Sequence, residues 1–189
     1  MSCTIILGCF RSGSSAVAGV LHHLGLFMGE YFDEPNRRNP KGFFEDKEFK
    51  PLHWRMVEGE DCSEEYEKLV RKRERFYPQW GLKDPRLCLT FPKLQEILTC
   101  DSRVIACVRP KEQIVESLAN ALGVPSELKS FAPLVEHYQT SMEQHLQTYP
   151  KPVMSMDFDR LFWHPERTVE LIANFVNMPV NQEAVDFLK

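Results

Sequence analysis

The residues that point most directly to chemistry form the segment Gly8-Cys9-Phe10-Arg11-Ser12-Gly13-Ser14-Ser15. It lies between an apolar run at residues 4–7 and a helix-forming run at residues 16–24. A strand, a turn of small residues and a helix in this order direct backbone N–H groups and the positive end of a helix dipole at one point. The Gly-x4-Gly spacing is that of a phosphate-binding P-loop. We therefore predict an anion site at this turn.

The basic residue of this loop does not stand where an ATPase has it. An ATPase P-loop carries Lys at the position of Ser14, whereas here the basic residue is Arg11, three residues earlier. A P-loop enzyme that uses magnesium also needs an apolar strand that ends in Asp. Residues 153–156 do lead into Asp157, but this segment matches a different motif, described below. We therefore expect no bound metal.

A second anion signal comes later in the chain. Arg109 follows the apolar run at residues 104–108, and Pro110 then opens a predicted helix. Ser117 stands eight residues after Arg109, about two helical turns along. A guanidinium can hold a phosphate with two hydrogen bonds, and a hydroxyl can add a third. Two separated basic sites predict a ligand that carries two anionic groups.

Composition narrows the class of protein. The chain has 189 residues, 43% of them apolar, which is enough for one core, so residues 1–189 are predicted to form one domain. A net charge of -4 argues against a nucleic-acid partner. The first residues do not resemble a signal peptide, and no apolar run reaches the roughly 18–20 residues of a membrane span. The six cysteines lack metal-binding spacing and are expected to be reduced thiols of a cytoplasmic protein. The sequence does not indicate an oligomeric state.

Short apolar runs alternate with helical patterns along the chain. This alternation predicts an α/β fold with three layers, α/β/α, around a central and mainly parallel sheet, as in P-loop NTPases. A charged helix over residues 64–75 is expected to be exposed. The polar segment at residues 33–46 is expected to be a functional loop, because Phe43 and Phe44 can anchor it to the core. Strands are predicted at residues 4–7, 81–83, 104–108 and 153–156, and further helices at residues 14–24, after residue 110, around 135–146 and around 169–176.

Taken together, these motifs resemble those of sulfotransferases that use 3′-phosphoadenosine-5′-phosphosulfate (PAPS). Arg11-Ser12-Gly13-Ser14-Ser15 is similar to the family's strand–loop–helix motif, which would hold the 5′-phosphosulfate group. Arg109 and Ser117 match the family's 3′-phosphate motif, a strand that ends in Arg with Ser eight residues on. Residues 39–46 and 80–86 look like segments of the bacterial branch of the family.

The resemblance extends over roughly residues 4–176 and implies a reaction. The protein would transfer a sulfuryl group from PAPS to a hydroxyl or amine of a small-molecule acceptor and release 3′,5′-adenosine bisphosphate (PAP), without a metal. Residues 156–161 are similar to the family's Tyr-Glu-Asp-Leu turn, with Phe158 at the Tyr position, where its ring could stack on adenine. Arg11 is the candidate for contact with the leaving phosphate, where charge develops.

The acceptor also needs a general base within hydrogen-bond reach. The cytosolic branch of the family has a His in a Lys-Thr-His strand, but here Asp84 directly follows Lys83. Family members that lack this His use a carboxylate from the region of Glu45. Glu45 is therefore the first candidate, and Asp84, at the end of a predicted strand, is the second. Without the resemblance, Glu45 could equally begin a helix, and residues 83–86 could form an ion-paired turn.

Two other functions stay open at this point. A P-loop kinase for nucleotides or small molecules would share the fold, but it should have Lys at position 14 and a magnesium-binding carboxylate. A sulfotransferase-like binding protein with weak catalysis would account for the missing His. It would also account for the absence of the Gly-x-x-Gly-x-Trp-Lys segment that closes over the cofactor in the cytosolic branch. A cysteine phosphatase does not fit, because Cys9 would need Arg six positions later, where Ser15 stands.

Overall fold

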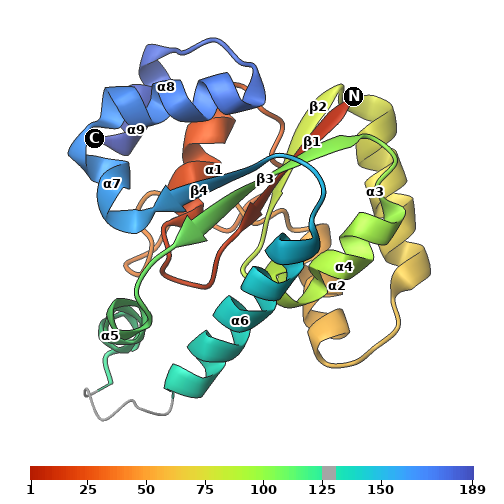
Figure 1. Cartoon of the computed structure of the whole chain (residues 1–189), viewed down its shortest axis with the longest axis horizontal. Helices are drawn as coiled ribbons and strands as arrows, with labels where there is room; N and C mark the ends of the chain where they lie inside the picture. The colour runs from red at the N-terminus through yellow and green to blue at the C-terminus, as the bar shows by residue number, and fades with distance from the viewer. Residues whose placement is uncertain (125–130) are drawn as a thin grey trace.

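A computed structural model describes residues 1–124 and 131–189 (Figure 1). Its sheet has the strand order β2-β1-β3-β4, and each neighbouring pair is parallel. The predicted strands are confirmed, with slightly different bounds: β1 Ser2–Leu7, β2 Gln79–Lys83, β3 Asp101–Val108 and β4 Val153–Asp157.

The sequence of β1 is an apolar run because helices cover both faces of the sheet at this strand. In β1, Cys3, Ile5 and Leu7 pack into the hydrophobic core on one face, whereas Ile6 packs into the core on the other. Successive side chains of a strand point to opposite faces, so a strand buried on both sides is mostly apolar rather than alternating. The register of β1 against β2 and β3 places it in the middle of the sheet.

The helices form two layers (Figure 1). One layer contributes to the core beside Ile5, and the other to the core beside Ile6, which confirms the predicted three-layer α/β/α architecture. The first layer consists of α2 (Phe49–Val57), α3 (Ser63–Phe76), α4 (Leu87–Ile97), α5 (Lys111–Leu122) and α6 (Ala132–Thr148). The second consists of α1 (Ser14–His23), α7 (Phe158–Trp163), α8 (Pro165–Val176) and α9 (Gln182–Leu188).

Two features of the helices differ from the sequence expectations. Helices α4, α7 and α9 were not predicted. In α4, Pro92 lies inside the helix and removes one backbone donor, but the buried apolar face stabilises the helix through tertiary packing. Helix α3, predicted to be exposed, buries Tyr66 and Val70 and also the charged Arg73 and Glu74. The charged sequence of this helix does not reveal its buried face, because long charged side chains can be buried when they form ion pairs or hydrogen bonds.

The parallel arrangement brings the functional segments to one edge of the sheet. The carboxyl ends of β1, β2, β3 and β4 lead into the segments that contain Arg11, Asp84, Arg109 and Phe158. Ligands of open α/β sheets bind at this edge. Within the described residues, no helix is long and apolar enough to span a membrane.

Replacing Gly8 by Ala should lower the free energy of unfolding by about 1–3 kcal/mol. A Cβ atom at position 8 would lie 2.5 Å from Ser12 Oγ and 2.9 Å from Cys107 Cβ. Since β1 and β3 are paired along their length, neither can move aside.

The comparison variant is Gly59→Ala. Its Cβ would meet no described atom within 4 Å, so it carries only the strain of a positive φ of 87°, worth about 1 kcal/mol. Urea unfolding measures both losses. A loss for Gly8→Ala no larger than that for Gly59→Ala would contradict the close packing at the start of the loop.

Candidate functional site

The loop after β1 has the backbone of an anion-binding turn. Arg11 and Gly13 both have positive φ, 64° and 89°, and this alternation directs successive N–H groups towards one side of the turn. Ser12 donates from its hydroxyl to the Cys9 carbonyl at 2.6 Å, which fixes the turn from inside. Gly13 precedes α1, and no described side chain caps the helix. The first N–H groups of α1 are therefore free to bind an anion.

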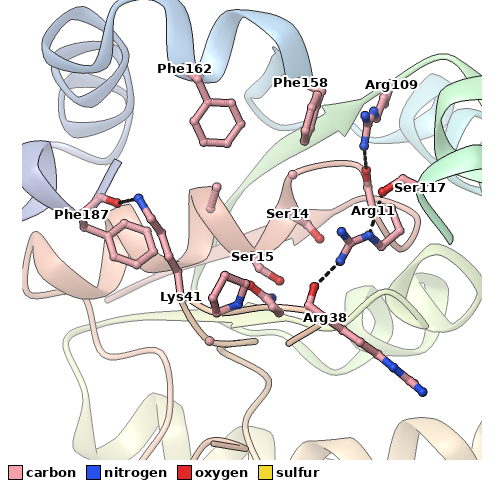
Figure 2. Close-up of a pocket in the computed structure, with 15 residues that line it drawn as sticks. Arg11, Ser14, Ser15, Arg38, Lys41, Arg109, Ser117, Phe158, Phe162 and Phe187 are labelled. Atoms are coloured by element: carbon pink, nitrogen blue, oxygen red, sulfur yellow. Dashed lines mark hydrogen bonds between the residues drawn. The ribbon is translucent and has the colours of Figure 1, made fainter. Parts of the chain in front are cut away.

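The two predicted anion motifs are in direct contact (Figure 2). Arg11 Nε donates to Ser117 Oγ at 3.0 Å, although 106 residues separate them in sequence. Arg109 Nη1 donates to the Arg11 carbonyl at 2.8 Å, and the Arg109 guanidinium lies over the Phe158 ring at 3.7 Å. The structure thus brings together Arg11, Arg109, Ser117 and Phe158, four residues chosen from three different segments.

No carboxylate of the described residues forms a salt bridge with either of these two arginines. Burial lowers the pKa of Arg11, and burial together with the charge of Arg11 lowers the pKa of Arg109. An anion placed between the arginines and the loop N–H groups would relieve this repulsion.

A cavity of about 380 Å³, here called the first cavity, opens over this loop (Figure 2). Residues 38–42 form one wall, and Phe158, Phe162 and Phe187 form another. Lys41 Nζ donates to the Phe187 carbonyl at 2.5 Å, and Arg11 Nη1 donates to the Arg38 carbonyl at 2.8 Å. These two bonds attach residues 38–42 to α9 and to the anion-binding loop.

A second cavity, of about 500 Å³, lies next to the first. Both are lined by Arg11, Ser14 and Ser15, so the anion-binding loop is the shared wall. The second cavity combines charged side chains with apolar ones. Its remaining lining residues are Phe10, Asp33, Asn36, Arg38, Asn39, Phe43, Glu45, Lys50, Trp54, Lys83, Pro85, Arg86, Leu118, Ala121, Leu122 and Tyr138.

Glu45 lies in the wall of the second cavity. Its carboxylate accepts from Lys83 Nζ at 2.9 Å and lies 3.5 Å from Lys50 Nζ and 3.7 Å from Arg86 Nη2. Lys83 also donates to Ser15 Oγ at 3.1 Å, which links Glu45 to the first turn of α1. Glu45 does not begin a helix, because α2 starts only at Phe49. Lys83 thus lies between the Glu45 carboxylate and the start of α1 in the wall of the second cavity.

Asp84 occupies a different environment. It is 2% exposed and lines neither cavity. Its carboxylate accepts from Arg86 Nη2 at 2.6 Å and from the Arg86 backbone N–H at 2.9 Å, and it lies 3.1 Å from His53 Nδ1. Burial raises the pKa of Asp84, but the charges and hydrogen bonds of His53 and Arg86 outweigh burial and hold it at about 2. The ion-paired turn is therefore present, and Asp84 is poorly placed to act as a base.

Cys9 is part of the loop but not of its chemistry. The thiol is 1% exposed, and burial raises its pKa to about 12. A buried neutral thiol is no nucleophile, since thiolates carry that reactivity. The six cysteines are all free and buried. Within the described residues, no group of three or more His, Cys, Asp or Glu side chains is arranged to hold a metal ion.

Several basic residues of the site did not emerge from the sequence analysis as site residues. They include Arg38, Lys50, Lys83 and Arg86, all of which line the second cavity. Lys83 is the last residue of β2, and the position of a polar residue at the carboxyl end of a buried parallel strand could have identified it. No comparable signal marks Arg38 or Arg86, because their roles depend on contacts between distant segments.

Comparison with solved structures identifies the class of fold. The chain aligns over its full length with the sulfotransferase domain of an olefin synthase from Synechococcus PCC 7002, covering 78% of that chain with a TM-score of 0.65 and 14% identity. Over 98% of its length it aligns with sulfotransferase STF9 from Mycobacterium avium, covering 66% of that chain with a TM-score of 0.64 and 15% identity. It aligns equally with sulfotransferase STF1 from Mycobacterium tuberculosis H37Rv, covering 70% of that chain with a TM-score of 0.64 and 16% identity.

The protein therefore has the sulfotransferase fold. No protein-family model matches its sequence, and no curated protein sequence matches it significantly.

Replacing Asp84 by Asn should change how stability depends on pH. The pKa of Asp84 in the folded protein, about 2, lies below its ordinary value of 3.8. Its carboxylate therefore adds stability that is complete above the ordinary value and is lost as the pH falls through the folded value. Between about pH 5 and pH 2, the wild type should lose about 2 kcal/mol more than the variant.

Urea unfolding of both proteins at a series of pH values measures this difference. Parallel stability curves for the two proteins over the acid range would contradict an ionised Asp84 held by His53 and Arg86.

Proposed function

We propose that the protein is a sulfotransferase that transfers a sulfuryl group from PAPS to a hydroxyl or amine of a small-molecule acceptor. The observation that carries this proposal is the contact of Arg11 with both Ser117 and Arg109 at the anion-binding loop. It forms one site with two basic centres and free helix N–H groups, as a ligand with two phosphate-like groups requires.

The residues of the first cavity fit PAPS. Residues 11–15 would hold the 5′-phosphosulfate through backbone N–H groups and the Arg11 guanidinium. Arg109 and Ser117 would hold the 3′-phosphate, and Phe158 would pack against adenine. Residues 38–42 form the opposite wall and would limit access of water. When bound, PAPS supplies the activated sulfuryl group.

The chemistry requires one bond to form and one to break. The acceptor oxygen or nitrogen bonds to sulfur as the bond from sulfur to the phosphate oxygen breaks, and PAP leaves with the electron pair of that bond. Arg11 and Lys83 lie beside the loop where negative charge develops on the leaving oxygen. Positioned cations in a partly buried site stabilise such charge more strongly than water does.

Glu45 is the residue that we assign as the general base. It lines the second cavity and is joined through Lys83 to Ser15, so an acceptor in that cavity can reach both the carboxylate and the donor site. It takes the proton that the acceptor hydroxyl or amine loses. Asp84 acts instead as a positioning residue, because its carboxylate accepts a hydrogen bond from Arg86 Nη2 and holds that side chain in place.

Calorimetric titration with PAP, without metal, tests the donor site. PAP should bind more tightly than ATP with magnesium, because the site has two basic centres, Arg11 and Arg109, and has Ser14 where an ATPase has Lys. Preference for ATP with magnesium would indicate a P-loop kinase. Binding of neither nucleotide would contradict the proposed donor site. Binding of PAP without any sulfuryl transfer would indicate the weakly catalytic binding protein.

In the same titration, Arg109→Ala should weaken PAP binding by about 1.5–3 kcal/mol, the worth of a charged hydrogen-bond partner. The matched control is Arg75→Ala, which removes the same charge from the far end of α3 and should leave the affinity unchanged. Unchanged affinity in Arg109→Ala would remove this residue from the donor site.

Replacing Glu45 by Gln should lower kcat by about 10²–10⁴ and leave PAP affinity intact, because the amide cannot accept the proton. The control is Glu64→Gln, an exposed change in the first turn of α3. Turnover is followed by release of PAP, and thermal unfolding verifies that the variant is folded. A folded Glu45→Gln protein with full activity would move the base elsewhere.

A further inference from the structure

The second cavity is more basic than an acceptor with a single neutral hydroxyl requires. Within the described residues, five basic side chains line it against two acidic ones, Asp33 and Glu45. Of the five, Arg11 and Lys83 lie at the anion-binding loop, and Lys50 is paired with both acidic residues. The backbone carbonyl of Arg38 accepts a hydrogen bond from Arg11, and Arg38 also lines the first cavity. Arg86 also lines the wall of the second cavity, where its Nη2 donates to Asp84 at 2.6 Å and lies 3.7 Å from Glu45.

The Arg86 guanidinium is held in one orientation. Its side chain is 8% exposed, and its guanidinium lies over the Trp54 ring at 4.4 Å. Nη2 donates to Asp84 at 2.6 Å, and Asp84 lies 3.1 Å from His53 Nδ1. His53 Nε2 in turn is 3.0 Å from the Tyr66 hydroxyl. A side chain supported in this way loses little conformational entropy when it binds a ligand.

Arg86 has hydrogen-bonding capacity that the protein does not use. Its Nε is buried and has no hydrogen-bond partner among the described residues. An unpaired buried N–H group costs free energy, and such groups need an explanation in a folded protein. The guanidinium fork matches the two oxygens of a carboxylate. Nη1 also forms no hydrogen bond with a described residue and, unlike Nε, is not fully buried, so an anionic group of a ligand in the cavity could bind there.

Part of the cavity wall is apolar. Phe10, Trp54, Leu118, Leu122 and Tyr138 all line it, and Trp54 and Leu122 remain 49% and 39% exposed. Exposed apolar side chains beside a pocket are typical of a binding surface for an apolar ligand. The wall therefore offers contact area for the hydrocarbon or aromatic part of a ligand, and Arg86 and Glu45 are polar residues of the same cavity.

We propose that the acceptor is an apolar molecule that carries an anionic group of the carboxylate class in addition to its nucleophilic hydroxyl or amine, and that Arg86 binds this group. This inference rests on the proposed function, because it describes the second substrate of that reaction. It names Arg86 as a residue that determines acceptor specificity, and it assigns to Asp84 and His53 the role of holding Arg86 in place.

The test is equilibrium binding to the protein saturated with PAP, so that it does not depend on turnover. The probes are two hydroxy acids, 3-(4-hydroxyphenyl)propanoate and 12-hydroxydodecanoate, each compared with its methyl ester. The acid should bind more tightly than its ester by about tenfold or more, the gain expected from a charged hydrogen bond. Equal affinity of acid and ester for both probes, or binding of none of the four, would overturn the inference.

Variants assign the preference to Arg86. In Arg86→Met, the acid should lose its advantage while the ester keeps its affinity. Arg86→Lys should keep part of the advantage, because the charge stays and the fork is lost. Arg75→Met is the control and should behave as the wild type. An acid preference that survives in a folded Arg86→Met protein would contradict the assignment. If that protein does not fold, Arg86→Lys decides, and a full preference in it would contradict the use of the fork.

Failure of this inference and failure of the proposed function give different results. Sulfuryl transfer to the esters as fast as to the acids would leave the sulfotransferase proposal standing and overturn the role of Arg86. Preferential binding of the acids without any transfer from PAPS would support the anion subsite and contradict the proposed reaction.

Discussion

The buried ion pair between Lys83 and Glu45 is the interaction on which the site depends. Lys83 ends β2, and its ammonium group also donates to Ser15 in α1 and to the Phe43 carbonyl. An ammonium group buried to this extent is costly unless every donor finds a partner. The loop at residues 33–46 must therefore fold over the carboxyl edge of the sheet, because it supplies two of the three partners. One ion pair thus fixes a strand, a helix start and a loop relative to one another.

The opposite condition holds at the anion-binding loop, where no carboxylate of the described part of the chain pairs with the arginines. Arg11 and Arg109 lie close together and are fixed by hydrogen bonds to neutral groups, and no described side chain caps the nearby start of α1. Like charges in such proximity destabilise the protein without a ligand. The same arrangement stabilises a bound anion with two charged groups. The fold accepts a local cost in stability so that the ligand, rather than a carboxylate of the chain, completes the site.

A polar network behind the second cavity connects this chemistry to the core. In this network the Tyr66 hydroxyl contacts His53, His53 contacts Asp84, and Asp84 accepts a hydrogen bond from Arg86. Asp84 follows directly after Lys83, so the same strand end supplies both the cation that pairs with Glu45 and the anion that holds Arg86. Neighbouring residues at the end of a strand point in opposite directions, which lets one segment support two different parts of the site.

The sequence by itself determined the sheet and the two anion motifs. Apolar runs at residues 4–7 and 104–108 and the small residues after them are local signals, since a strand followed by a turn and a helix has a short-range pattern. It did not determine which side chains meet. Lys83 contacts Ser15 across 68 residues and Glu45 across 38, and Arg86 depends on α2 for Trp54 and His53. Only the tertiary structure decided these pairs, because burial makes each buried charge find a partner wherever the packing brings one within reach.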